Sequence, residues 1–423
     1  MPLRWRATAA ALVCALHLAL FVPTIGDWSS ILVNDFAPQA RAIRDGDLPY
    51  RDQDIEYPPL SVPVLIAPAY VDDSTQGFTD GFMWEMLGFD LAMVVLIAFG
   101  LPGDRRRVIS AVGIYTVGVV TLSGVVLDPS LIDTGPLILT RFDLVPVVFV
   151  LAAVLARDRG RSATWSALVS IGAGIKAFPL LLYPALARGE PNPRRVIVAG
   201  AMPLLVCAAA VLVIGDEFGS AISYHTERAL QVESLAASPF EIAHELGGGA
   251  KVVTGHGGFE ISAGGATAAR WISVLVGAAG YLTLVLAGWR SRATNLELVT
   301  ALLAMLVVFS PVLSPQFLLW LLPVSACAYG LGRENAILLL AVLFTQIGLQ
   351  HYDGVDSLDP SFVWPVAARN GFLLVYLGLV ASPILRDGGL LTRSRLETTT
   401  GRRTGSLAST AIAAIAMPKN QGM

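Results

Sequence analysis

The chain has 423 residues, of which 54% are hydrophobic, and its mean hydropathy is +0.64. This composition is too apolar for a soluble domain and the chain is too long for one span, so we expect a polytopic membrane protein. The net charge of −3, without a long basic block, argues against a nucleic-acid partner. The cysteines sit singly in apolar runs and indicate neither disulfides nor a metal site: Cys14, Cys207 and Cys327.

The N-terminus combines a basic start, residues 1–6, with an apolar stretch at 8–24. Signal peptides share this pattern, but here no clear small-residue cleavage site follows and many more apolar stretches do. We therefore predict an uncleaved first helix. Its N-terminus is expected to be cytoplasmic, because Lys and Arg concentrate on that side of a membrane.

The first predicted outer loop, 25–81, is dense in charge, although only 14% of the whole chain is charged. A solvated loop would explain the charge, but the aromatic and proline anchors, Tyr50 and Tyr57-Pro58-Pro59, favour a site. Residues 58–71 are apolar yet about half the length needed to cross, so we expect an interfacial or re-entrant helix packed on the outer face. A crossing there would place the basic residues 105–107 outside, against the charge rule.

Further apolar stretches predict crossings, and the basic residues between them mark the cytoplasmic ends. The crossings are expected at residues 82–101, 108–127, 144–156, 196–214, 270–289, 295–312, 317–332, 335–350 and 365–385. A second outer loop spans 128–143 and a long one 215–269, and the polar tail 392–423 is expected to be disordered and cytoplasmic. The sequence thus predicts an all-α polytopic membrane protein with one domain, 1–391, about ten transmembrane crossings and short interfacial or re-entrant helices.

The stretch 163–187 is interrupted by Lys176-Ala177-Phe178-Pro179 and is flanked by basic residues at 157–161 and 188–195. Two half-helices with Lys176 at the turn would keep both flanks cytoplasmic, and one kinked span is the alternative. A lysine within the membrane region needs an anion or a water-filled cavity. Lys176 is therefore expected to bind either a lipid phosphate or a structural carboxylate.

Asp35 follows the first helix and precedes a short predicted helix at 38–43. It is either the N-terminal cap of that helix, a position that Asp favours, or a general base at the membrane–water boundary. Two carboxylate pairs follow, in Asp45-Gly46-Asp47 and Asp52-Gln53-Asp54. Their spacing suits either turns or a divalent cation, so a cation is possible but not required.

Other polar residues lie at the predicted helix ends. Two prolines start a helix directly after Glu56 and Tyr57, and because lipid-exposed Glu is costly, Glu56 is expected to face a cavity. Arg141 and Asp143 close the second outer loop, either as a structural ion pair or as ligand-binding residues. Gln316 offers an amide to a sugar or phosphate.

The histidines lack regular metal spacing, so each by itself is interpreted as structural. They are His225, His244, His256 and His351. His351 follows a predicted crossing on the outer side, and it is also kept as a candidate substrate-binding residue.

Several short motifs follow one another along the chain. In order, they are Asp35 after the first helix, Gly46-Asp47-Leu48-Pro49-Tyr50, Tyr57-Pro58-Pro59-Leu60, Arg141-Phe142-Asp143-Leu144-Val145-Pro146, Lys176-Ala177-Phe178-Pro179 and Ser314-Pro315-Gln316-Phe317-Leu318-Leu319-Trp320. Together they resemble the GT-C-fold, polyprenyl-phosphate-mannose-dependent α-mannosyltransferases of actinobacterial cell envelopes. The resemblance covers about residues 8–385 and depends on order and spacing rather than on one motif. Relatives often carry histidines after the Ser-Pro element, where this chain has Gln316 and Phe317.

The resemblance implies a plasma-membrane glycosyltransferase with both termini cytoplasmic and its active site on the outer face. The donor would be a polyprenyl-phosphate sugar, expected to be mannose, and the acceptor a glycolipid or cell-envelope glycan among the membrane lipids. The catalytic acid of the family's first outer loop maps onto Asp35, which would take the proton of the acceptor hydroxyl. Substrate binding would fall to Glu56, Tyr57, Arg141, Asp143, Lys176, Gln316 and His351.

Two other functions remain as alternatives. A transporter or flippase of a lipid-linked sugar would need ionisable groups deep in several helices, and the predicted spans carry few besides Lys176. A non-catalytic membrane scaffold would not account for the acidic first loop.

Overall fold

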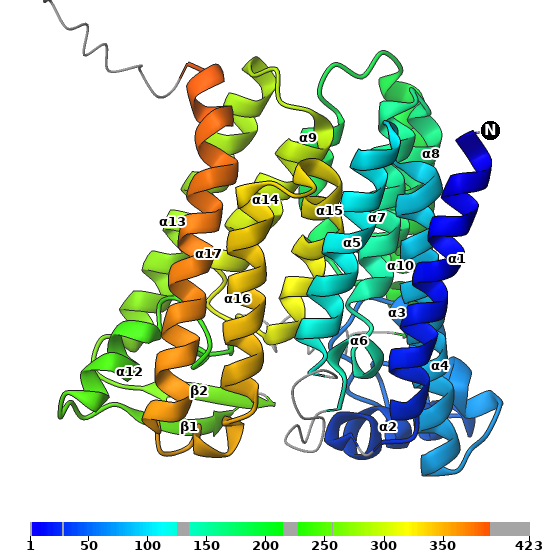
Figure 1. Cartoon of the computed structure of the whole chain (residues 1–423). Helices are drawn as coiled ribbons and strands as arrows, with labels where there is room; N and C mark the ends of the chain where they lie inside the picture. Colours follow the sequence, from blue (N-terminus) through cyan, green and yellow to red (C-terminus); the bar gives the residue numbers. More distant parts are fainter. Residues whose placement is uncertain (1, 28, 125–134, 215–226, 256, 390–423) are drawn as a thin grey trace, which may run out of the picture.

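The computed structural model describes residues 2–27, 29–124, 135–214, 227–255 and 257–389, and it is mostly helical (Figure 1). The helices are α1 (Pro2–Phe21), α2 (Ala37–Arg44), α3 (Ser61–Ile66), α4 (Thr75–Val95), α5 (Arg105–Leu122), α6 (Leu137–Thr140), α7 (Leu144–Asp158), α8 (Ser162–Ile175), α9 (Tyr183–Leu186), α10 (Pro193–Ile214), α12 (Ser238–Glu245), α13 (Ala266–Arg290), α14 (Asn295–Val308), α15 (Leu318–Tyr329), α16 (Arg333–Leu349) and α17 (Pro360–Asp387). The tail 392–423, much of the loop 128–143, His225 and His256 lie outside the described residues.

The expected all-α class needs one correction, because the long loop 215–269 contains a β-hairpin. Strands β1 (Lys251–Gly255) and β2 (Gly258–Ser262) pair antiparallel from Lys251 opposite Ser262 to Gly255 opposite Gly258. The strands carry the β-branched and aromatic residues that favour a pleated surface, and glycines lie at the turn between them.

Among the described residues, five helices are long and apolar enough to cross a membrane. They span residues 3–24, 75–100, 193–213, 266–290 and 360–387. The other helices expected to cross are shorter, from 12 residues in α15 to 18 in α5, and pack beside them in the bundle (Figure 1). The predicted number of ten crossings therefore stays a prediction.

Helices α10 and α13 expose large apolar side chains, which suits helices that face lipid rather than water. The exposed residues include Ile197, Val198, Met202, Leu205, Leu212, Trp271, Ile272, Leu275, Leu282 and Leu286. Their apolar surface, together with the five span-length helices, supports a membrane protein.

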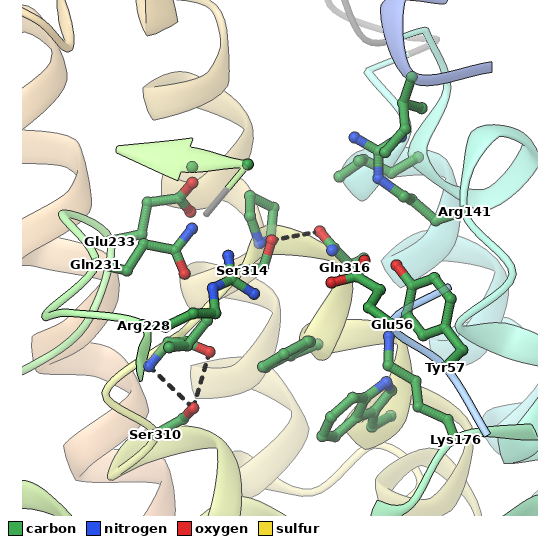
Figure 2. A pocket seen from close by; sticks show the side chains of 18 of the residues that line it. Glu56, Tyr57, Arg141, Lys176, Arg228, Gln231, Glu233, Ser310, Ser314 and Gln316 are labelled. Carbon is green, nitrogen blue, oxygen red and sulfur yellow. Dashed lines mark hydrogen bonds between the residues drawn. The ribbon is translucent and has the colours of Figure 1, made fainter. Parts of the chain in front are cut away.

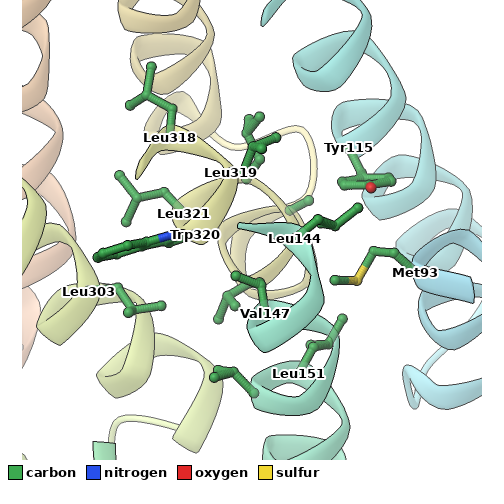
Figure 3. Close-up of a cluster of buried hydrophobic side chains, with 14 of the residues drawn as sticks. Met93, Tyr115, Leu144, Val147, Leu151, Leu303, Leu318, Leu319, Trp320 and Leu321 are labelled. Carbon is green, nitrogen blue, oxygen red and sulfur yellow. The ribbon is translucent and has the colours of Figure 1, made fainter. Parts of the chain in front are cut away.

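The buried core lies between helices of the middle of the bundle: α4, α5, α7, α14 and α15 (Figure 3). Met93, Leu144, Val147, Leu303 and Leu319 are fully buried within it. Close packing here fixes the ends of these helices, and the loops at those ends carry the candidate site.

A second set of contacts inside the bundle is polar. The Asp90 carboxylate on α4 lies 2.5 Å from His17 Nδ1 on α1 and accepts a hydrogen bond of 2.7 Å from the Tyr115 hydroxyl on α5. Nε2 of His17 lies 3.0 Å from the Thr116 hydroxyl. We call these four residues the His17–Asp90 cluster; it ties α1 to α4 and α5.

Hydrogen bonds from arginine side chains connect the basic loops at one end of the bundle. Arg6 donates to carbonyls at the end of the span 75–100, and Arg188 donates to Gly288 and Ala293 near the end of α13. Guanidinium groups suit such carbonyls because the last turn of a helix leaves them unsatisfied. The basic loops thus share one face, as the charge pattern predicts, and the cytoplasmic side assigned to that face stays a prediction.

The stretch around Lys176 forms a hairpin of two short pieces. α8 ends at Ile175, and a 3₁₀ turn at Phe178–Leu182 leads into α9. Arg157, before the hairpin, donates hydrogen bonds to the carbonyls of Leu186 and Arg188, after it. Both flanks therefore lie together, which confirms the two half-helices and excludes the single kinked span.

At the opposite end of the bundle lie α2, α12 and the β-hairpin (Figure 1). The apolar segment expected at 58–71 forms α3 and a 3₁₀ turn, Ala67–Tyr70. At about 1.5 Å per residue this helical segment is too short to cross, as predicted.

Candidate active site

A cavity of about 920 Å³ lies among the loops opposite the basic end. Its lining combines carboxylates, cations and amides with apolar residues such as Ile31, Leu181 and Leu306. Of the residues singled out in the sequence, the cavity brings together Asp35, Glu56, Tyr57, Arg141, Lys176 and Gln316. Figure 2 labels all of these except Asp35. Such mixed lining is typical of a ligand site rather than of a packed core.

Asp35 lies in a π-helical turn, Leu32–Phe36, that runs directly into α2. Helical backbone already begins at Ser30, so the alternative of Asp35 as an N-terminal cap is wrong. π-turns inside helices are frequent at functional sites, because the extra residue redirects a side chain. Here the turn presents an exposed Asp35 to the cavity.

Nearby charges and burial act together on Asp35. Partial burial raises the pKa of its carboxyl above the ordinary value, Arg141 counteracts this rise, and Glu56 adds to it. A base with a raised pKa accepts a proton more readily than an ordinary carboxylate, provided that it is ionised at the working pH.

Glu56 and Tyr57 are held by the turns before them. Gly46 adopts φ +121°, which only glycine takes readily, and Tyr50 has φ +67°. In this conformation the buried Tyr50 donates a hydrogen bond of 2.5 Å to the carbonyl of Tyr57. The aromatic anchors of the loop thus fix the segment that carries Glu56.

The Tyr57 ring packs edge-on against Phe142, with ring centroids 4.6 Å apart. Its hydroxyl is hydrogen-bonded to the Glu56 carboxylate. The pKa of Tyr57 is raised well above its ordinary value, mainly by burial and to a smaller extent by the negative charge of Glu56. Tyr57 is therefore a neutral hydrogen-bonding group that orients Glu56.

The carboxylate pairs of the first loop belong to turns. Asp45 pairs with Arg44 at 2.8 Å, and Asp52 accepts hydrogen bonds from the Leu48 amide and from Arg51. Within the described part of the chain, no group of three or more His, Cys, Asp or Glu side chains is placed to hold a metal ion. The contacts of Asp45 and Asp52 agree with the turn interpretation, and the role of a divalent cation stays a prediction.

Lys176 forms an ion pair with Asp143, with 2.7 Å between Nζ and Oδ1, and Trp320 donates to the same oxygen at 2.8 Å. The ammonium group also lies 5.4–5.5 Å from four aromatic ring centroids: Tyr57, Phe142, Phe317 and Trp320. Cation–π contacts at this distance are attractive. The structural carboxylate expected for Lys176 is thus present, and it is Lys176 rather than Arg141 that binds Asp143.

The remaining predicted residues are placed as follows. Arg141 lines the cavity next to Asp35, and Gln316 lines it while accepting a hydrogen bond of 2.7 Å from the Ser314 hydroxyl. His351 is exposed and lies outside the cavity lining of the described chain; its neighbour Tyr352 lines the cavity instead.

Sequence reasoning missed a buried ion pair behind the cavity. Glu233, in the long loop, accepts a hydrogen bond of 3.1 Å from Arg369 on α17 and one of 3.2 Å from the Tyr352 hydroxyl. Glu233 lines the cavity, and both side chains of the pair are almost fully buried. The signal that could have revealed it is Arg369, because an arginine inside a predicted span requires a partner.

The fold and the cavity define a helical membrane protein with a charged site at one end of its bundle. The chain belongs to glycosyltransferase family 87, whose family model matches residues 56–315. The matched region includes most of the cavity lining, but Asp35 precedes it. The protein is therefore a membrane glycosyltransferase.

A structural comparison finds a likeness to the arabinosyltransferase EmbB from Mycobacterium smegmatis, solved by single-particle cryo-EM, with 14% sequence identity and a TM-score of 0.37. The likeness covers 92% of this chain and 43% of that chain, so this chain spans less than half of that protein's length. Curated proteins provide no match.

Proposed function

We propose that this glycosyltransferase moves mannose from a polyprenyl-phosphate donor to a lipid-linked or cell-envelope glycan on the outer face of the plasma membrane. The observation that carries the proposal is the cavity, which is lined both by the carboxylates of Asp35 and Glu56 and by the cations of Arg141 and Lys176. A transfer from a lipid phosphate needs both kinds of charge, one to accept a proton and one to stabilise the phosphate.

In the proposed reaction, Asp35 takes the proton of an acceptor hydroxyl while the oxygen attacks the anomeric carbon of the donor sugar. The bond between that carbon and the phosphate oxygen breaks, and polyprenyl phosphate leaves with the negative charge. Arg141 and Lys176 stabilise this charge by preorganised electrostatics. The apolar residues of the lining, including Ile31 and Leu181, suit the first part of a lipid chain.

The proposal is tested with purified protein and labelled polyprenyl-phosphate mannose. Release of polyprenyl phosphate together with label on an added glycolipid supports it. Movement of intact lipid across liposomes without cleavage would instead support the flippase. The His17–Asp90 cluster does not favour that alternative, because its ionisable groups are fully buried, bind one another and lie outside the cavity lining of the described chain.

The proposed orientation has a separate test. Single cysteines are placed at Ser74 and Gly247 in a cysteine-free background and treated with a membrane-impermeant thiol reagent in intact, wall-permeable cells. Both should be labelled if the cavity end of the bundle faces outward. Protection of the Gly247 cysteine would overturn the orientation, and protection of Ser74 alone would mean that residues 58–71 cross.

A further inference from the structure

The cavity has a second wall that the proposed chemistry does not use. It is formed by Arg228, Gln231 and Glu233, which lie across the cavity from Glu56, Tyr57 and Lys176 (Figure 2). We call these three residues the Gln231 wall. It belongs to the segment between α10 and α13, whereas the opposite wall belongs to the first loop and the α8–α9 hairpin.

Glu233 is fixed in this wall from behind. Besides accepting from the Arg369 guanidinium and the Tyr352 hydroxyl, it accepts through its backbone carbonyl from Arg369 and Asn370. Asn370 also donates to the Ser238 hydroxyl of α12 at 2.8 Å. The carboxylate is thus held rigidly to α17 before any ligand binds, which lowers the entropy cost of using it as a ligand-binding group.

Gln231 is equally fixed, but its side chain is not satisfied. Its backbone amide donates to the Pro311 carbonyl at 3.0 Å, and the residue forms a β-bridge with Glu260. Its side-chain oxygen is buried and has no hydrogen-bond partner among the described residues. Because an unpaired buried acceptor is costly, a lining group in this state is available to a ligand donor.

Glycine at the hairpin tip lets the backbone approach this amide closely. A Cβ at Gly258 would lie 3.3 Å from Nη2 of Arg228 and 3.6 Å from Nε2 of Gln231. The wall therefore brings acceptors of Gln231 and Glu233 and the guanidinium group of Arg228 together on one side of the cavity (Figure 2).

This combination suits a sugar rather than a phosphate. Hydroxyl groups both donate and accept, so they can bind an amide oxygen, a carboxylate and a guanidinium together. Each wall carries at least one cation and one carboxylate, and Glu233 is paired with Arg369, so charge alone does not distinguish the walls. The distinguishing feature of the Gln231 wall is its amide oxygen, unpaired within the described chain, which can accept a hydrogen bond from a sugar hydroxyl but not from an ionised phosphate.

We propose that the Gln231 wall is the subsite for the hydroxyl groups of the acceptor sugar, with Gln231 contributing to the choice of acceptor. The inference rests on the proposed transfer reaction, and it assigns the side of the cavity from which the acceptor hydroxyl approaches. Glu233 and Gln231 are substrate-binding groups in this scheme, and the proton still passes to Asp35.

The test measures full-length protein with polyprenyl-phosphate mannose as donor and octyl α-D-mannopyranoside as acceptor probe. Gln231→Leu should raise the acceptor KM about five- to tenfold, the loss expected for one buried hydrogen bond. The donor KM should not change. A merely structural role would alter both substrates alike.

Gln346→Leu on α16 is the matched control, since Gln346 is also a buried amide without a partner in the described chain but lies outside the cavity lining. It should keep both KM values. Gly258→Ala is a second variant in case Gln231→Leu does not fold, and it should also raise the acceptor KM by crowding Arg228 and Gln231. An unchanged acceptor KM in the folded variants, or an equal rise in the donor KM, overturns the subsite.

Failure of the proposed reaction is visible separately, because wild-type protein would then release no polyprenyl phosphate. Equilibrium binding of octyl α-D-mannopyranoside, followed by saturation-transfer NMR, still decides the subsite in that case. Binding to wild type that is weakened in Gln231→Leu supports it. Equal binding to both, or no binding to wild type, contradicts it.

Discussion

Two groups of polar side chains inside this protein use the same residue types in opposite ways. In the His17–Asp90 cluster, the imidazole, the carboxylate and the Tyr115 hydroxyl bind one another and all are fully buried. In the cavity, Asp35 is exposed and the side-chain oxygen of Gln231 is buried without a partner in the described chain. The cluster is closed to ligands, and the cavity is open to them.

The difference shows that residue type does not identify a site. Leaving a buried polar group unpaired is costly, so a fold usually pairs its buried acids, and the cluster follows this rule. Helix α1 exposes much of its surface, including Leu3, Leu12 and Leu16. Because lipid provides no hydrophobic force between helices, polar contacts are one of the few interactions that can fasten α1.

The largest expected effect comes from Asp35, and it separates the cavity from the cluster most sharply. Asp35→Asn keeps size but cannot take a proton, so transfer should fall about 10²–10⁴-fold with little change in stability or donor binding. Asp35→Glu should also be slow, since an added methylene moves the carboxylate. Initial rates of transfer and thermal unfolding measure both quantities.

Neighbouring acids in the first loop provide the controls. Asp45→Asn, Asp47→Asn and Asp52→Asn alter turns and should be milder. The wild-type rate should fall as pH drops through the pKa of Asp35, which lies above the ordinary Asp value. If Asp35→Asn transfers at the wild-type rate while a control is inactive, the base is a different carboxylate.

The cluster should show the reverse pattern. Asp90→Leu leaves His17 and the Tyr115 hydroxyl without their acceptor, so stability should fall by about 1–3 kcal/mol. The double variant His17→Leu/Asp90→Leu should lose less than the sum of the single losses, because no charged partner stays buried alone. Specific activity of the folded fraction should not change; a loss comparable to that of Asp35→Asn would mean that the cluster belongs to the machinery.

Hydropathy and charge predicted most of the fold, because lipid requires long apolar helices and places basic loops together. The same rules predicted the break at Lys176 and the short helix near residue 61. Local capping signals agree as well: Thr294 and Glu297 form the capping box that starts α14. These features depend on neighbours in the chain, which is why one sequence shows them.

The parts that the sequence did not reveal depend on distant contacts. Glu233 and Arg369 lie 136 positions apart, and no local pattern pairs them. The binding of Asp143 to Lys176 rather than to Arg141 likewise follows from how α8 packs against α7. The β-hairpin was missed for a different reason, since its alternating residues lie within a glycine-rich loop whose signals are short.

Substitution of Lys176 should give the third-largest effect. It tests whether a residue that already forms an ion pair can also bind a ligand. Lys176→Met should raise the donor KM about tenfold if the ammonium binds the phosphate, and Lys176→Arg should restore part of the loss. The single change also removes the ion-pair partner of the buried Asp143, which keeps the hydrogen bond from Trp320, so stability should fall too.

The double variant Lys176→Met/Asp143→Asn separates the two roles. It should recover stability, because the buried charge is removed, but its donor KM should stay high. Recovery of the donor KM together with stability would show that Lys176 acts only through its ion pair.

The smallest expected effect concerns Glu241 on α12, a buried acid that interacts electrostatically with Arg369 and Glu233. It is fully buried, and neither carboxyl oxygen has a partner within the described residues. Burial raises its pKa well above the ordinary value; Arg369 opposes this, and Glu233 adds to it. Between the unfolded pKa, about 4.3, and this raised value, the folded state holds the extra proton, so the free energy of unfolding falls as pH rises, by at most about 1.4 kcal/mol per pH unit.

Glu241→Gln removes this term, so the Tm in detergent should decline less between pH 5 and 7.5 than in wild type. Glu245→Gln on the same helix, where the side chain is partly exposed, should keep the wild-type slope. Parallel curves for wild type and Glu241→Gln would show that Glu241 finds a partner and belongs, like Asp90, to the paired class.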